Sequence, residues 1–292
     1  PAEVTESVLQ VNQAAQPVFT YLANDIALSG QSEGIPFSMV SAIDFDGSFH
    51  LETVEGNPIA APRSDEIILN QWAADDLQAQ LGDPVRLTYY EPETTHGNEV
   101  ERSIELKLSA IAKLTEPSQP PRYRRRADAV PAVYDRRPTM ANDPDLTPQV
   151  PGVTDAESIE KWDLPFNTAD RIRPEDDDYW TVYRTTPKAF VNLELGRKLW
   201  GSRFGETTSI RIPVSDASRE KLSRLIRDQL MDDKKSVGLE LVSIKRNGLQ
   251  ASSGSTPFDI LFLALSMFVI GSALILVSLL FRLALTQRSS EI

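Results

Sequence analysis

Cysteine is absent from the 292-residue sequence, and histidine occurs only twice. The lack of cysteine excludes a disulfide framework, thiolate zinc sites and cysteine nucleophiles, but it does not identify the cellular compartment. His50 and His96 lie far apart in the sequence and lack the spacing of a metal-binding pair. We interpret both as surface or structural residues and expect no metal site.

Catalytic and nucleotide-binding motifs are also missing. The sequence has no G-x-S-x-G, H-E-x-x-H or G-x-x-x-x-G-K-[ST] motif. No nucleophile–base pair or pair of carboxylates stands out either. We therefore expect a chain that is not an enzyme and holds no cofactor, and that does not itself bind ATP through a P-loop.

Basic residues are fewer than acidic residues. The formal net charge is −12, from 30 Lys and Arg against 42 Asp and Glu. The four charged side chains after residue 256 cancel one another, so the whole excess lies on residues 1–256. An acidic surface repels polyanions, which makes a nucleic-acid partner unlikely on physical grounds.

One long stretch has no charge at all. Ile260 to Phe281 is 22 uncharged residues, long enough at about 1.5 Å per residue to cross a hydrocarbon core of about 30 Å. A buried core helix would rarely need so long an apolar run. We predict a transmembrane helix over 260–281, with the lipid bilayer as a partner, and a short following segment at 282–292.

Small residues recur within this apolar stretch. Ala264, Gly271 and Ser278 are spaced by seven and therefore share one helix face. Small residues let helix backbones approach closely in lipid, which favours packing against a sibling helix. The alternative is chance, because small residues are common in membrane helices, and the sequence leaves both open.

The region before the membrane stretch reads as α+β. Residues 1–115 contain strand-like runs at 18–28, 35–45, 66–69, 85–90 and 104–111, and a helix at 70–81 that Gly82 and Pro84 should end. Residues 188–250 follow the order β-α-β-α-β, with strands at 189–193, 207–213 and 238–245. That order predicts mixed sheets with a ferredoxin-like part. Residues 251–259 form a linker to the membrane helix.

Residues 116–187 have a different composition, with frequent proline and blocks of charge. So long an irregular stretch predicts an insertion laid over the surface, with a helical turn or two at 156–162. Glu175–Asp178 could hold a divalent ion, but we favour a solvated charge block. A basic island, Arg122–Arg126 with Arg136 and Arg137, could touch lipid headgroups or an acidic partner, though a charged mobile insertion is the simpler interpretation.

Two stretches resemble the FtsX/MacB-type permeases of ABC transporters. The membrane end, FLALSMFVIGSALILVSLLFRLALTQRSSEI, resembles their second transmembrane helix and the Arg-x-x-Glu-Ile sequence after it, here Arg288, Glu291 and Ile292. EIILNQWAADDLQAQLGDPVRLTYY resembles their extracytoplasmic core, where a small helix precedes a Leu-x-x-Gly-Asp turn. The stretch TPKAFVNLELGRKLWGSRFG also fits that core, so the resemblance covers about half the chain.

The resemblance implies a MacB-like periplasmic core followed by one transmembrane helix of a bacterial cytoplasmic membrane. Residues 1–259 would be periplasmic or extracellular and the C-terminus cytoplasmic, with one further helix before this segment and two after it. The partners would be a cytoplasmic ABC ATPase and a second permease copy or homologue. Arg288 and Glu291 would lie at or just before the contact with the ATPase, although a headgroup-facing position is as compatible with their sequence.

The function implied is mechanotransmission, in which ATP hydrolysis in the cytoplasm moves the extracytoplasmic domain for export or for lipoprotein or peptide handling. The alternative is a single-pass, membrane-anchored extracytoplasmic binding or sensor domain, in which the helix only tethers the acidic region.

Overall fold

The computed structural model describes residues 2–45, 50–94, 99–122, 130–163, 171–213, 215–232 and 258–289. The chain divides into two compact units, residues 1–237 and 238–292. The first holds all the strands of the described chain, and the second holds one long helix.

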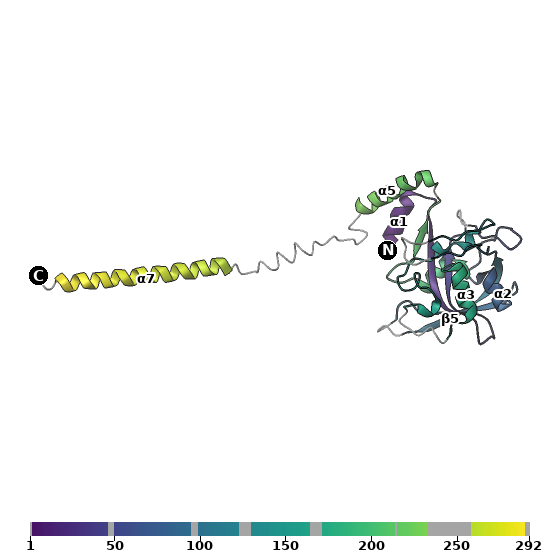
Figure 1. The fold of residues 1–292 in the computed structure, drawn as a ribbon, viewed down its shortest axis with the longest axis horizontal. Helices are drawn as coiled ribbons and strands as arrows, with labels where there is room; N and C mark the ends of the chain where they lie inside the picture. The colour runs from purple at the N-terminus through teal and green to yellow at the C-terminus, as the bar shows by residue number, and fades with distance from the viewer. Residues whose placement is uncertain are drawn as a thin grey trace. The chain divides into compact units, whose positions relative to one another are not determined.

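The first unit is built around a closed β-barrel (Figure 1). Six strands close the ring in the order β2-β6-β3-β5-β4-β1, because β1 also pairs with β2, and β7 extends the sheet beyond β1. The sheet is mixed, since β6 runs parallel to β2 and β3 runs parallel to β5 while the other pairs are antiparallel. The strands are β1 (Gln16–Leu28), β2 (Ile35–Ile43), β3 (Glu66–Asn70), β4 (Pro84–Tyr90), β5 (Glu101–Ala112), β6 (Ala189–Asn192) and β7 (Ser209–Arg211).

Strand β1 is the longest and has three neighbours. Its 13 residues pair with β2 along one edge, and with β7 and then β4 along the other. A register shift between Ala23 and Asp25 marks an irregularity in the pairing with β4, as expected where a strand must bend to close a barrel. The first and last described strands of the unit, β1 and β7, are therefore paired with each other.

Two short helices pack on the barrel. Asn70 caps α2 (Gln71–Leu77), because its side-chain oxygen accepts the N–H of Ala73 at 2.8 Å. Helix α4 (Leu193–Trp200) lies so close to β2 that a Cβ at Gly196 would overlap the Cβ of Ala42. The main apolar cluster joins the buried faces of both helices to side chains from β1 to β6.

The described parts of residues 116–187 fold onto the barrel. They include the 3-10 turns η3 (Met140–Asn142), η4 (Pro144–Leu146) and η5 (Ile159–Lys161), and a helix, α3 (Pro174–Tyr183). The predicted helical turn near 156–162 is confirmed by η5. The charge block at Glu175–Asp178 is not simply solvated, because it forms the first turns of α3 and the side chain of Asp176 is buried.

The structure confirms an α+β fold with a mixed sheet but corrects the expected ferredoxin-like part. Strands β6 and β7 are not neighbours: β6 lies between β2 and β3, and β7 lies beside β1. The helix predicted over 70–81 also ends earlier, at Leu77, because Gln78 adopts the left-handed conformation with φ 53°. Leu81 is consequently exposed and does not share the buried helix face.

Two helices flank the barrel strands in sequence. Helix α1 (Ala2–Val11), which the sequence patterns did not predict, contacts α5 (Asp216–Asp232). The two helices stand together beside the barrel in Figure 1.

The second unit contains α7 (Phe258–Ser289). Its segment Ile260–Gln287 is long and apolar enough to cross a membrane, which supports the predicted single transmembrane helix. Several predicted features lie outside the described residues: His96, most of the basic island (123–126), the strand at 238–245, the linker up to 257, and Glu291.

Candidate functional site

The segments by which the chain enters and leaves the barrel lie side by side. Strands β1 and β7 pair antiparallel, with Gln16 opposite Arg211 and Val18 opposite Ser209. Helix α1 precedes β1, α5 follows β7, and the two helices are in contact. We call this element, made of α1, α5 and the β1–β7 ladder, the seam.

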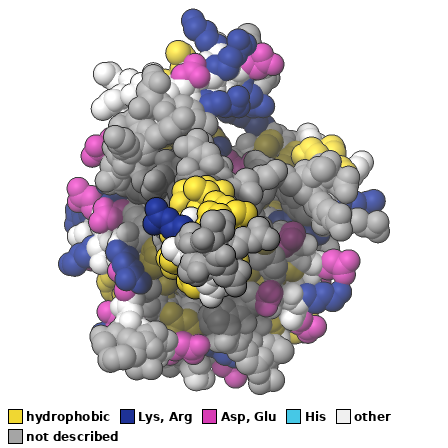
Figure 2. Space-filling model, turned by 90° about the vertical axis from the view of Figure 1, so that its left-hand side faces the viewer, with side chains coloured by type: hydrophobic (Ala, Val, Ile, Leu, Met, Phe, Trp, Pro, Cys, Tyr) yellow, Lys and Arg dark blue, Asp and Glu magenta, His cyan; other side chains and the backbone are white. Residues whose placement is uncertain are grey.

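Exposed charged side chains of both signs cover α5. Four exposed cationic side chains project from it, and Figure 2 shows Lys and Arg side chains gathered at the top of the molecule, where α5 lies. They are Arg219, Lys221, Arg224 and Arg227. Exposed Glu220 and Asp228 lie among these cations, and Glu220 pairs with Arg224, so the surface of this helix is mixed in charge.

The insertion is held to the barrel by two apolar clusters. Ala141 and Leu146 pack with Ile43, Ile68 and Phe190 of the sheet. A second cluster joins four insertion side chains to Phe37 and Met39 of β2; they are Val153, Ile159, Trp162 and Trp180. Burying this much apolar surface favours a fixed position for the insertion.

A buried ionic network fastens α3 to the barrel. Asp176 accepts hydrogen bonds from the guanidinium of Arg173 at 2.9 and 3.0 Å and from Lys188 Nζ at 3.2 Å. Arg173 also reaches Asp76 of α2 at 2.9 Å. Burial alone would raise the pKa of Asp176, but the hydrogen bond from Arg173 and the positive charge of Lys188 outweigh it and lower that pKa.

Lys188 lies between two aromatic rings as well as beside Asp176. Its Nζ is 4.6 Å from the ring centroid of Trp72 and 4.7 Å from that of Tyr179. Burial lowers the pKa of Lys188 to about 8, because the nearby Asp176 only partly offsets desolvation. Tyr179 donates to the carbonyl oxygen of Thr186 and accepts from the side chain of Asn70, so the network also reaches the cap of α2.

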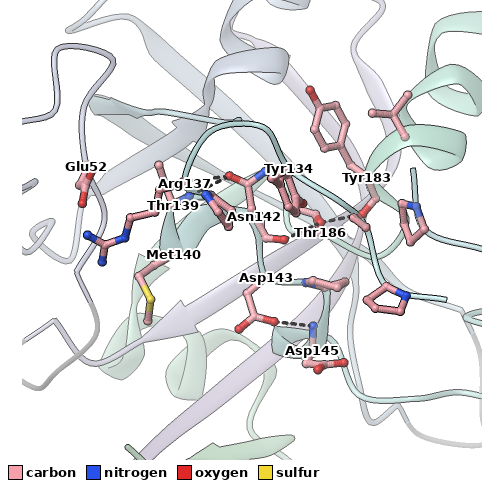
Figure 3. A pocket seen from close by; sticks show the side chains of 16 residues that line it. Glu52, Tyr134, Arg137, Thr139, Met140, Asn142, Asp143, Asp145, Tyr183 and Thr186 are labelled. Carbon is pink, nitrogen blue, oxygen red and sulfur yellow. Dashed lines mark hydrogen bonds between the residues drawn. The ribbon is translucent and has the colours of Figure 1, made fainter. Parts of the chain in front are cut away.

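Beside this anchor, the insertion forms a groove of about 410 Å³ (Figure 3). Its wall combines the half-buried rings of Tyr134 and Tyr183 with Met140 and several prolines. The prolines are Pro121, Pro131, Pro138 and Pro144. Apart from Glu52, every lining residue comes from 121–186, so the barrel alone would not have this groove.

Asn142 fixes the floor of the groove. Its side-chain oxygen accepts the backbone N–H groups of Thr115 and Thr139, and its nitrogen donates to the carbonyl oxygen of Thr115 at 2.7 Å. The backbone oxygen of Asn142 also accepts the hydroxyl of Thr186 at 3.5 Å (Figure 3). Because the buried amide is fully used by the chain, it positions the wall rather than offering bonds to a ligand.

Charged groups at the groove are mainly acidic. Among the described residues, the lining includes Glu52, Asp143 and Asp145 and one cation, Arg137. Asp143 pairs with Arg211 of β7 and accepts the N–H of Asp145. Burial and the negative charge of Glu116 raise the pKa of Tyr183 to about 12, so both groove tyrosines are neutral hydroxyls at physiological pH.

The helix-packing and ATPase-contact residues predicted from the sequence are not among the described residues that line this groove. Ala264, Gly271 and Ser278 lie on α7, and a Cβ at Gly271 would meet nothing within 4 Å, so a partner helix has room there. Helix packing stays a prediction.

Arg288 falls in the last turn of α7, but its side chain and Glu291 lie outside the described residues. His50 is exposed, and within the described ranges no three His, Asp or Glu side chains gather as a metal site would require.

Sequence reasoning missed the groove and the ionic anchor. One signal was available: Trp162, Tyr179 and Trp180 are large aromatic residues in a stretch read as an exposed insertion, and such residues usually need burial. No protein-family model matches this chain, and no curated protein matches it.

Proposed function

We propose that this chain is part of a permease subunit of an FtsX/MacB-type ABC transporter. In this proposal it couples ATP hydrolysis by a cytoplasmic ATPase to movement of the barrel unit on the other side of a bacterial cytoplasmic membrane. The unit would work in export or in lipoprotein or peptide handling. A second permease copy or homologue would complete the assembly.

The seam is the observation that carries the proposal. An extramembrane domain inserted between two membrane helices must receive and release its chain at neighbouring points. Here α1 contacts α5, and β1 pairs with β7 directly beyond them. A domain that is merely tethered by one helix has no such requirement, so the side-by-side arrangement favours the permease over the anchored domain.

Three further features fit mechanotransmission. The barrel is closed and its core is continuous, so it can move as one body. Helix α7 provides an apolar span of 28 residues for a membrane. Exposed cationic side chains of α5, such as Arg227, can contact anionic lipid headgroups.

A distance measurement across the seam tests the proposal. Because these 292 residues contain no cysteine, paired labels can be introduced at Gln10→Cys on α1 and Arg227→Cys on α5 once any cysteine elsewhere in the parent protein is replaced. The labelled parent protein would be reconstituted in nanodiscs with its ATPase, and the spin–spin distance measured with and without ATP. We expect the ATPase to co-purify and the α1–α5 distance to change on ATP binding.

A label pair on the barrel serves as the control. Glu33→Cys and Asp65→Cys place both labels at exposed barrel positions, and their distance should stay constant with nucleotide. An unchanged α1–α5 distance, together with no ATPase in the purified complex, would contradict the proposal.

The groove favours the second candidate, an anchored binding or sensor domain. A concave site of this size, with an apolar wall and a few charges, is typical of ligand pockets. The two functions are compatible, because a permease domain can also bind a ligand. Only a parent protein with a single membrane span would leave the anchored domain as the whole function.

A further inference from the structure

The insertion groove has the chemistry of a binding site for a small organic cation. We propose that it binds a ligand with a flat apolar body and one quaternary or protonated amine. This inference goes beyond the permease proposal and does not depend on it, because it concerns only the barrel unit.

The wall of the groove suits a flat apolar body. Tyr134 and Tyr183 present half-buried rings, and the proline rings and Met140 are apolar surfaces that offer no side-chain hydrogen bond. Aromatic faces also attract cations, because the ring quadrupole is negative above its plane. Figure 3 shows the two tyrosine rings on the same side of the groove.

The carboxylates supply the charge preference. Among the described residues, the side chains of Glu52 and Asp145 make no hydrogen bond or ion pair, whereas Asp143 is paired with Arg211. Figure 3 places Glu52 and Asp145 at separate edges of the groove. Arg137 is the one cation among the described lining residues, so the two carboxylates leave one net negative charge that a bound cation would neutralise.

The groove is also firmly shaped. Its floor is fixed by Asn142, and its α3 side by the ionic network around Asp176. A site whose walls are already in place loses little conformational entropy when a ligand binds. Its volume of about 410 Å³ suits a small molecule rather than a folded partner.

Benzyltriethylammonium is a suitable probe, because it is water-soluble and combines one aromatic ring with one permanent charge. Its binding to the full chain in detergent micelles would be measured by equilibrium dialysis, with protein-free micelles subtracted. Benzyl alcohol and benzoate are the neutral and anionic counterparts. We expect saturable binding of the cation, and at least tenfold weaker binding of both counterparts.

Two variants locate the site. Glu52→Gln/Asp145→Asn should weaken cation binding at least tenfold, while the control Glu33→Gln/Asp65→Asn, which removes the same charge at exposed positions elsewhere, should not. Met140→Lys, at a position whose side chain is 37% exposed, places a positive charge in the groove and should abolish binding without unfolding the barrel. Thermal unfolding of each variant verifies its fold.

Equal affinity for the cation and for benzoate would overturn the proposal, as would cation binding that is unaffected by both groove variants. Tight binding of a cationic peptide combined with no binding of benzyltriethylammonium would also overturn it, in favour of a peptide groove. None of these outcomes depends on ATPase coupling, so failure here and failure of the permease proposal are distinguishable.

Discussion

Lys188 Nζ lies 3.2 Å from Asp176 Oδ1, and the two side chains are only 4% and 1% exposed. The pair joins the residue that leads into β6 to the first turn of α3, so it ties the insertion to the barrel. Removing one partner of a buried ion pair leaves the other charge without compensation, which is strongly destabilising. Several expected outcomes depend on this arrangement and on the core around it.

Breaking this buried pair should destabilise the barrel unit more than breaking an exposed one. We expect Asp176→Asn or Lys188→Met to lower the free energy of unfolding by about 3–5 kcal/mol, measured by urea denaturation. Glu157→Gln, which removes a partner of the exposed Lys161, should cost under about 1 kcal/mol. A similar loss in the buried and exposed variants would mean that the network contributes little.

Stability should also depend on alkaline pH through Lys188. Its pKa in the folded chain is about 8, lower than the ordinary value of 10.5, so between these values the unfolded state binds more protons. The free energy of unfolding should therefore rise from pH 8 to pH 10.5 relative to Lys188→Met, which lacks the group. Denaturant titrations at several pH values measure the difference, and a fall over this range would contradict it.

Trp180 should hold the insertion in place. Its ring packs edge to face on Trp162 with centroids 5.1 Å apart, and it is 2% exposed. Trp180→Ala should cost about 3–5 kcal/mol and make 130–163 sensitive to limited proteolysis. The matched control is Phe204→Ala at an exposed ring, which should change neither stability nor cleavage.

Gly196 should tolerate no larger residue. A Cβ there would overlap Ala42, so Gly196→Ala should push α4 away from β2 and lower the free energy of unfolding by about 1–3 kcal/mol. The double change Gly196→Ala/Ala42→Gly restores the space and should recover part of the loss. Thermal unfolding of both variants provides the measurement, and a neutral single variant would refute the close approach.

Asn142→Ala should loosen the groove. The change leaves the N–H of Thr115 and the carbonyl oxygen of Thr115 without their partner in a buried position, which costs about 1–3 kcal/mol for each unsatisfied group. Asn57→Ala, in an exposed turn, should stay within about 0.5 kcal/mol. Chemical denaturation compares the two.

In the membrane helix, Gly271→Leu should weaken self-association if Ala264, Gly271 and Ser278 form a packing face. Val269→Leu lies on the opposite face and should have no effect. Cross-linking of the parent protein in membranes measures the association. Unchanged cross-linking of Gly271→Leu would reject the packing face.

Local patterns predicted the strands well, because apolar and β-branched runs such as Glu66–Asn70 report burial directly. They did not predict the closed barrel, since the order of strands depends on long-range pairing such as β6 with β2. The helix α3 was hidden because its first turn, Glu175–Asp177, is acidic and its amphipathic pattern is weak. Its stability comes from tertiary contacts of Asp176 and Trp180 with residues distant in the sequence, and local patterns do not report such contacts.

Pairing at the seam has a mechanical consequence. The β1–β7 ladder contains only three residue pairs, and Gln16 and Arg211 form the pair nearest to α1 and α5. A force that separates the two helices would load this pair first and then the others in turn, like a zipper. Strand β7 can therefore peel away while β1 remains paired with β2 and β4 and the six-stranded ring stays closed.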